Sequence, residues 1–171
     1  AHVSRLTRIL ERTRFESLLY LSSTRVYARS SSAREDSTLS VDPRDPEDLY
    51  QLSKLTGESL CLNYRMTSVR VARLSNVFGP PIEGAGMHPE SLLPGLMRSA
   101  IADRRVRLRS APESAKDYVF VDDVARALRH VALVGRDRLY NVASGVNVSN
   151  RDIVGRLADV ATFSVRSAEV P

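Results

Sequence analysis

Two short apolar segments on either side of a long amphipathic one constrain the fold of this chain most strongly. Residues 17–21 and 68–74 have the composition of buried strands, and residues 47–66 between them have the length and spacing of a helix. A helix between two strands is typical of a crossover that places the strands side by side and parallel, in a right-handed βαβ unit. Residues 139–143 predict a third strand next to them. The sequence therefore predicts an α/β fold, with these three strands adjacent in chain order.

The rest of the chain shows further helical and extended patterns. An alternating segment at 105–109 predicts a strand, and residues 116–121 are expected to be extended. Residues 22–46 form a long polar stretch without periodicity, and long loops in compact domains are usually functional. Additional helices are expected at 3–10, 90–102, 121–134 and 148–161.

The composition indicates one ordinary core. The chain has 171 residues, of which 43% are hydrophobic, and this is enough for a single domain. No apolar run reaches the ~18 residues of a membrane span, and no secretory leader pattern opens the chain. Cys61 is the only cysteine, so it forms no internal disulfide, and without clustered histidines and cysteines we expect no metal site. We therefore expect a cytoplasmic protein with no membrane partner.

The positive charge raises the question of nucleic acid binding. The formal net charge is +5 and the pI is near 9.8, but the 25 basic residues are interspersed with 20 acidic ones. Arg105, Arg107 and Arg109 share one face of a predicted strand, yet no aromatic residues interleave with them to stack on bases. We expect this face to be solvated or to line an anion pocket, and we expect no nucleic acid partner.

Tyr50 and Lys54 lie one helical turn apart in the predicted helix 47–66. Side chains four residues apart share a helix face, and an ammonium beside a phenol favours the phenolate that can accept a proton. Only Lys54 and Lys116 are lysines among the 25 basic residues, and lysine differs from arginine in being a compact point charge. Because this spacing is common on surface helices, its meaning depends on the motifs around it.

Four more motifs accompany the pair. The segment LYLSSTRVY (19–27) places hydroxyl groups at the end of a predicted strand, where open α/β sheets bind ligands. The others are RLSNVFGP (73–80), KDYVFVDDVA (116–125) and YNVASG (140–145). In this order the five motifs resemble the extended short-chain dehydrogenase/reductase family, the NAD-dependent epimerases and dehydratases that act on nucleotide sugars. The resemblance covers about residues 19–161. It implies a partial Rossmann-type, doubly wound parallel sheet with a small substrate-binding subdomain.

The resemblance also implies roles for individual residues. Tyr50 corresponds to the catalytic acid/base, and Lys54 to the partner that holds the nicotinamide ribose, so both are expected to bind the cofactor. Ser23 corresponds to the hydroxyl that binds the reacting sugar oxygen, with Ser22 and Thr24 as weaker candidates. The expected substrate contacts are Ser23, Asn76, Ser91, Leu92 and Lys116.

Three departures from the family pattern affect these expectations. Lys116 stands where the family usually has arginine, so the charge is kept but the two-pronged hydrogen bonding is lost. Ala28 replaces the usual glycine after Val26-Tyr27. The 4,6-dehydratases carry an acidic pair directly after the catalytic hydroxyl, and Thr24 and Arg25 occupy those two positions here. This last difference argues against dehydration.

The chain contains no glycine-rich pyrophosphate loop, since its first glycine is Gly57. We therefore expect a single incomplete domain, whose dinucleotide-binding half of about a hundred residues belongs to a longer parent enzyme. Residues 1–78 and 135–161 would be Rossmann elements, and residues 79–134 mainly the substrate-binding portion. NAD or NADP is expected for the parent, without binding to this chain alone. The strand at 17–21 would be a bare edge, which a homodimer or another association would cover.

The expected activity is NAD(P)-dependent epimerisation of a nucleotide sugar through a transient keto intermediate, with this chain supplying the Ser/Tyr/Lys residues and the substrate half. Two alternatives stay open. One is an NADPH-dependent keto-sugar reductase that uses the same residues, and the other is a catalytically inert, cofactor-free fragment that acts only by association.

Overall fold

A computed structural model of the chain describes residues 2–80, 92–108 and 110–167. The chain divides into two compact units. Unit 1 comprises Ala1–Ser75 with Asp122–Ala143, and unit 2 comprises Asn76–Val121 with Ser144–Pro171. Each unit has its own buried cluster of apolar side chains.

Unit 1 is built on a parallel sheet of three strands, β1 (Leu18–Ser23), β2 (Val69–Leu74) and β6 (Leu139–Val142), in the order β1-β2-β6. Both strand pairs are parallel. The central strand β2 is almost entirely buried, as expected of a strand covered on both faces. The predicted order of the three strands is confirmed.

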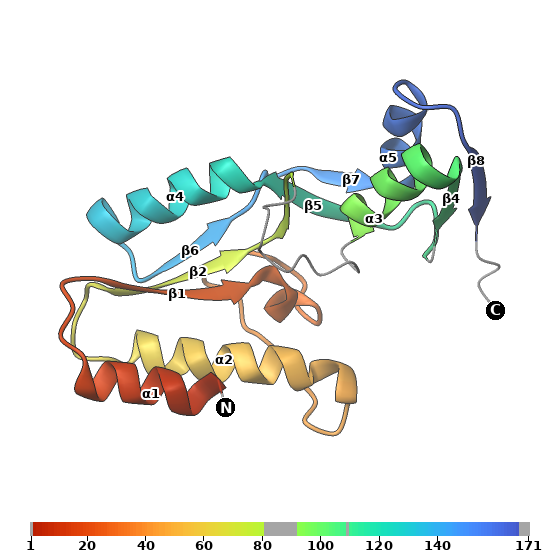
Figure 1. Ribbon diagram of the computed structural model, residues 1–171. Helices are drawn as coiled ribbons and strands as arrows, with labels where there is room; N and C mark the ends of the chain where they lie inside the picture. Colours follow the sequence, from red (N-terminus) through yellow and green to blue (C-terminus); the bar gives the residue numbers. More distant parts are fainter. Residues whose placement is uncertain (1, 81–91, 109, 168–171) are drawn as a thin grey trace. The chain divides into compact units, whose positions relative to one another are not determined.

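Helices cover both faces of this sheet. Figure 1 shows α1 (His2–Arg12) and α2 (Leu49–Leu62) on one face and α4 (Val121–Val134) on the other. This is the doubly wound arrangement expected from the sequence. The core between the sheet and the first two helices consists of Leu6, Leu10, Tyr20, Cys61, Val69 and Val71. Burial raises the pKa of the Cys61 thiol to about 11, so it stays protonated and unreactive at neutral pH.

The start of α2 is tied to the long polar loop before it. A short 3₁₀ turn, Pro46–Asp48, precedes the helix, which ends four residues before the predicted boundary at residue 66. The buried carboxylate of Asp48 accepts hydrogen bonds from Arg29 Nε at 2.6 Å, from the Asp42 N–H at 2.8 Å and from Gln51 Nε2 at 3.1 Å. These three bonds fix the position of the helix end that carries Tyr50.

Unit 2 contains shorter elements. Its first sheet has the order β3-β5-β7, and a separate pair joins β4 with β8 in parallel. The helix predicted near residue 90 is α3, which continues as a single π-helical turn, Ser99–Asp103. The bounds are β3 Asn76–Phe78, α3 Leu92–Arg98, β4 Arg105–Leu108, β5 Ala115–Phe120, β7 Asn147–Ser149, α5 Asn150–Ala158 and β8 Ser164–Ser167.

The alternation predicted for 105–109 is present in β4. Val106 and Leu108 are buried in the core of unit 2, whereas Arg105 and Arg107 are exposed. Arg109 lies outside the described residues. In the parts of the chain that the structure describes, no helix is both long and apolar enough to cross a membrane.

The last two helices predicted from the sequence lie in different compact units. Helix α4 belongs to unit 1, where the Ala132 carbonyl accepts a hydrogen bond of 2.7 Å from the Ser17 hydroxyl. Helix α5 belongs to unit 2, where Ile153 packs in the cluster that contains Val106 and Leu108. Each helix therefore contacts elements of its own unit.

Candidate active site

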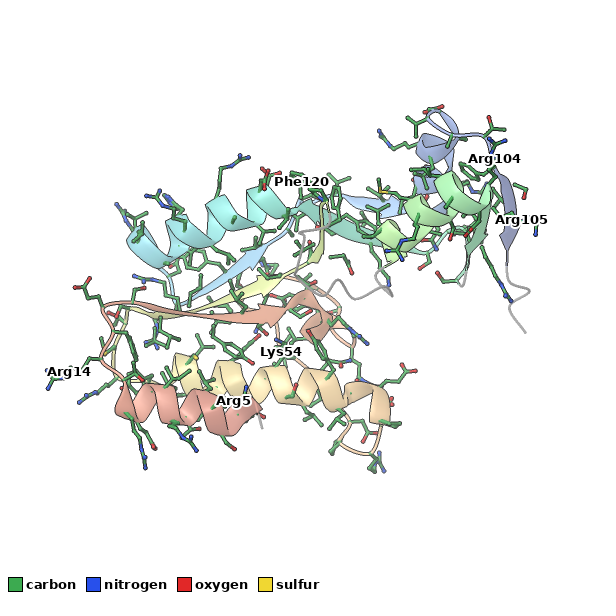
Figure 2. The ribbon with its side chains drawn as sticks, in the orientation of Figure 1. Arg5, Arg14, Lys54, Arg104, Arg105 and Phe120 are labelled. Carbon is green, nitrogen blue, oxygen red and sulfur yellow. The ribbon has the colours of Figure 1, made fainter. Side chains whose placement is uncertain are left out.

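The side chain of Lys54 extends from α2 toward the sheet of unit 1 (Figure 2). Its Nζ donates a hydrogen bond of 3.0 Å to the Leu21 carbonyl on β1. The same nitrogen is 5.7 Å from the ring centroid of Tyr50 and 5.7 Å from that of Tyr20. The hydrogen bond anchors the ammonium next to both aromatic rings.

The two tyrosines beside Lys54 differ in their environment. Tyr20 is buried in the core, and burial, followed by the charges of Cys61 and Glu58, raises the pKa of its phenol to about 12. It therefore stays protonated at neutral pH. Tyr50 has 42% of its surface exposed. Of the two phenols, only that of Tyr50 is accessible to a ligand.

Ser23 is the last residue of β1 and caps the 3₁₀ turn Thr24–Tyr27. Its Oγ accepts a hydrogen bond of 3.2 Å from the Arg25 N–H. No described residue accepts a hydrogen bond from the Ser23 hydroxyl, so its hydrogen is available to a ligand. Ser22, the weaker candidate, is buried, and its hydroxyl has no partner among the described residues.

Arg25 adds a second cation to this group. Its guanidinium carbon is 5.3 Å from the centroid of the Tyr50 ring, within the range of a cation–π contact. The family resemblance implies only that Arg25 stands where the dehydratases carry an acidic residue. The stacking on Tyr50 depends on how the turn after β1 meets α2, which no local pattern reveals.

A buried polar network lies behind the exposed residues. Arg73 on β2 makes three hydrogen bonds of 2.6–3.2 Å to the Glu58 carboxylate on α2. Its remaining nitrogen donates to Tyr27 Oη at 2.7 Å, and Tyr27 Oη donates to Asn141 Oδ1 at 2.9 Å. Burial opposes the charge of Arg73, but its hydrogen bonds to Glu58 and Tyr27 hold the guanidinium pKa above its usual value.

Sequence analysis missed this network, although two signals pointed to it. Arg73 lies next to apolar residues in a strand with the composition of a buried one, and a charged residue there needs a buried partner. Glu58 follows Lys54 at a spacing of four residues, so it continues the same helix row. The network ties α2, β2, β6 and the turn after β1 together.

Apart from Ser23 in unit 1, the predicted substrate contacts lie in unit 2 or outside the described residues. The exposed Asn76 begins β3, and its Nδ2 donates a 2.7 Å hydrogen bond to the Asp117 carbonyl. Lys116 is exposed on β5, in register with Val148 of β7. Leu92 begins α3, but its side chain, like all of Ser91, lies outside the described part of the chain. Their roles in binding stay predictions.

Asp117, next to Lys116, has a structural task. Its carboxylate accepts hydrogen bonds from the Ser144 N–H at 3.0 Å, the Gly145 N–H at 2.7 Å and the Val146 N–H at 3.1 Å. The turn requires Gly145, whose φ of 82° is unfavourable for other residues. Asp117 therefore joins β5 to the segment that follows β6 in the chain.

Gly57 allows α2 to approach β1 closely. A Cβ at this position would overlap the Tyr20 ring. Helix propensity favours alanine by about 1 kcal/mol, but the clash is expected to cost more, so Gly57→Ala should destabilise the protein by about 1–2 kcal/mol net. Urea unfolding measures this change.

Gly155 supplies the matched control. It lies within α5, and a Cβ there meets no atom within 4 Å. Gly155→Ala should therefore show the propensity gain alone and stabilise by up to about 1 kcal/mol. Equal effects of the two substitutions would contradict the close approach at Gly57.

Comparison with known proteins gives matches over most of the chain. A model of the NAD-dependent epimerase/dehydratase family matches residues 1–143. The chain is 32% identical over 132 residues to a dTDP-glucose 4,6-dehydratase of Streptomyces griseus, a match that covers 75% of this chain and 39% of the relative. It is 31% identical over 160 residues to a GDP-6-deoxy-D-mannose reductase of Pseudomonas aeruginosa, with coverages of 90% and 51%.

Solved structures agree with the fold. The NAD-dependent NDP-hexosamine 5,6-dehydratase TunA superposes with a TM-score of 0.80 at 24% identity, over 98% of this chain and 56% of that one. The chain thus spans between 39% and 56% of the length of these three proteins.

Proposed function

Because the chain belongs to the NAD-dependent epimerase/dehydratase family, we propose that it supplies the acid–base residues of an enzyme that epimerises a nucleotide sugar through a keto intermediate. The observation that carries the proposal is the placement of the accessible Tyr50 beside the anchored Lys54. Ser23 supports it, since its hydroxyl hydrogen is uncommitted at the carboxyl end of β1.

Each of the three residues has a defined task in this proposal. Tyr50 accepts the proton of the reacting sugar hydroxyl, and the ammonium of Lys54 is held beside the Tyr50 ring. Ser23 donates a hydrogen bond to the same oxygen and holds it in place. When the keto intermediate is reduced again from its other face, Tyr50 returns the proton.

Two residues of unit 1 would bind the nicotinamide end of the dinucleotide. Lys54 and Tyr50 present hydrogen-bonding groups suited to the hydroxyls of the nicotinamide ribose, and bound nicotinamide would accept and return the hydride. Gly57 cannot serve a pyrophosphate, because the Tyr20 ring occupies the space beside it. Homologous enzymes bind NAD or NADPH in their solved structures.

The two residues that follow Ser23, Thr24 and Arg25, argue against dehydration as the reaction. Elimination of water requires acid and base groups near the carbons that lose hydroxide and a proton, and Thr24 and Arg25 cannot supply a carboxylate. A keto-sugar reductase is the second candidate, since it would use Tyr50 and Lys54 unchanged. The similarity to the Pseudomonas aeruginosa reductase favours it.

A third candidate is a protein that acts by association alone. In the parts of the chain that the structure describes, β1 pairs with a strand on one side only, and Leu21 on that strand has 42% of its surface exposed. An edge of this kind can add a strand from another chain, so we propose that a second chain covers it.

Two parallel incubations separate the three candidate functions. The full-length protein is incubated with nucleotide sugars and a catalytic amount of NAD, and the products are followed by nuclear magnetic resonance. We expect an epimer without net formation of NADH. A deoxy keto sugar would contradict the argument from Thr24 and Arg25. In a parallel incubation with a keto sugar and NADPH, stoichiometric oxidation of NADPH would identify the reductase. Failure both to bind NAD and to convert any sugar would support association alone.

A further inference from the structure

Arg25 is held beside the proposed acid/base by two contacts. Its backbone N–H is bound by the Ser23 hydroxyl oxygen at 3.2 Å, and its guanidinium carbon is 5.3 Å from the Tyr50 ring centroid. The cation therefore has a defined position relative to the two residues that would bind the reacting oxygen.

The donors of this guanidinium are not used within the described part of the chain. No carboxylate there lies within ion-pair distance of Arg25, and its side chain, which is exposed, donates no hydrogen bond. A contact with the face of an aromatic ring leaves the in-plane N–H groups available. Other arginines do pair with carboxylates, namely Arg29, Arg34, Arg44, Arg73, Arg126 and Arg151.

A planar fork of N–H donors matches a carboxylate, with which it forms two parallel hydrogen bonds. We propose that Arg25 binds a carboxylate on the reacting sugar, so that the preferred substrates are nucleotide uronic acids rather than neutral nucleotide sugars. The inference rests on the proposed function, because it requires the sugar to react between Ser23 and Tyr50.

The position of the carboxylate in such a sugar favours it over the diphosphate as the partner of Arg25. In a hexuronic acid the carboxylate is attached to C5, next to the C4 hydroxyl. The diphosphate is attached to C1, on the far side of the ring from C4. A sugar that reacts at C4 therefore brings its carboxylate, and not its diphosphate, to the neighbourhood of Ser23 and Tyr50.

The test compares ligands that differ only in the carboxylate. Calorimetry on the full-length protein measures the affinities of UDP-glucuronate and UDP-glucose, of GDP-mannuronate and GDP-mannose, and of free UDP and GDP. We expect one of the two acids to bind more tightly than its neutral partner. Arg25→Gln should lower the affinity for that acid about 10- to 100-fold and leave the affinities for the neutral sugar and the free nucleotide unchanged.

The same calorimetric experiment includes a control variant and two outcomes that would contradict the proposal. Arg129→Gln removes an exposed arginine on α4 and should change none of the affinities. Equal weakening of acid, neutral sugar and free nucleotide by Arg25→Gln would assign Arg25 to the diphosphate and overturn the proposal, as would failure of both acids to bind better than their neutral partners. These readouts need no turnover, so selectivity for the acid can hold even where the assay for epimerisation fails.

Discussion

Replacing Tyr50 with phenylalanine is expected to lower kcat of the full-length enzyme about 10²- to 10⁴-fold, the usual contribution of a positioned acid/base group. Only the phenol oxygen is removed. The ring that lies 5.3 Å from the Arg25 guanidinium and 5.7 Å from Lys54 Nζ remains. The affinity for the nucleotide sugar should therefore stay nearly unchanged, so that the loss falls on kcat rather than on KM.

Tyr118 provides the control for this substitution. Its hydroxyl is buried in unit 2 and has no hydrogen-bond partner among the described residues. Tyr118→Phe removes the same atom from a place where it makes no hydrogen bond to a described residue, so both turnover and stability should be retained. Steady-state kinetics and calorimetry on both variants make the comparison. Turnover by Tyr50→Phe close to that of the unmodified enzyme would remove Tyr50 from the proposed role.

Replacing Glu58 with leucine is expected to lower the free energy of unfolding by about 3–5 kcal/mol, because it leaves a buried charge without its partner. Both side chains of the Glu58–Arg73 pair are 4% exposed, and the shortest distance between them is 2.6 Å. Among the described residues, Tyr27 would be the only hydrogen-bond partner left to the Arg73 guanidinium. Urea unfolding monitored by circular dichroism gives the change.

Two further variants test the cause of this loss. Glu113→Leu breaks the ion pair with Arg151, whose side chains are both mostly exposed, and should have little effect because water screens that pair. The double variant Glu58→Leu/Arg73→Met removes both buried charges and should recover most of the stability lost by Glu58→Leu alone. A double variant no more stable than Glu58→Leu alone would show that the loss comes from packing rather than from charge.

Local sequence patterns predicted the strands of the unit 1 sheet and the helices that cover it. Apolar runs located β1, β2 and β6, and helical spacing located α2 and α4, because the strands are buried and the helices are long enough to repeat their pattern. The family and the α/β fold, both predicted from five motifs, are confirmed. In unit 2, β3 and β7 have three residues each, which is too short for an alternating pattern to be recognised.

The candidate site was only partly accessible to sequence reasoning. The spacing of Tyr50 and Lys54 is local, and it was found. The contact of Arg25 with Tyr50 joins residues 25 positions apart, and the bond between Arg73 and Glu58 joins residues 15 positions apart. Such pairs depend on how the sheet and α2 pack together. A single sequence can show that a buried charge needs a partner, but it does not show which residue the packing brings to it.

Helix α2 carries Tyr50, Lys54 and Glu58 at intervals of four residues. A row with this spacing runs at an angle to the helix axis, and here it passes from Tyr50, with 42% of its surface exposed, to Glu58, with 3%. One insertion between Lys54 and Glu58 would turn the two halves of the row by about 100° relative to each other. If Glu58 kept its bond to Arg73, Tyr50 and Lys54 would face elsewhere. Evolution can therefore exchange residues along this helix far more easily than it can change the length.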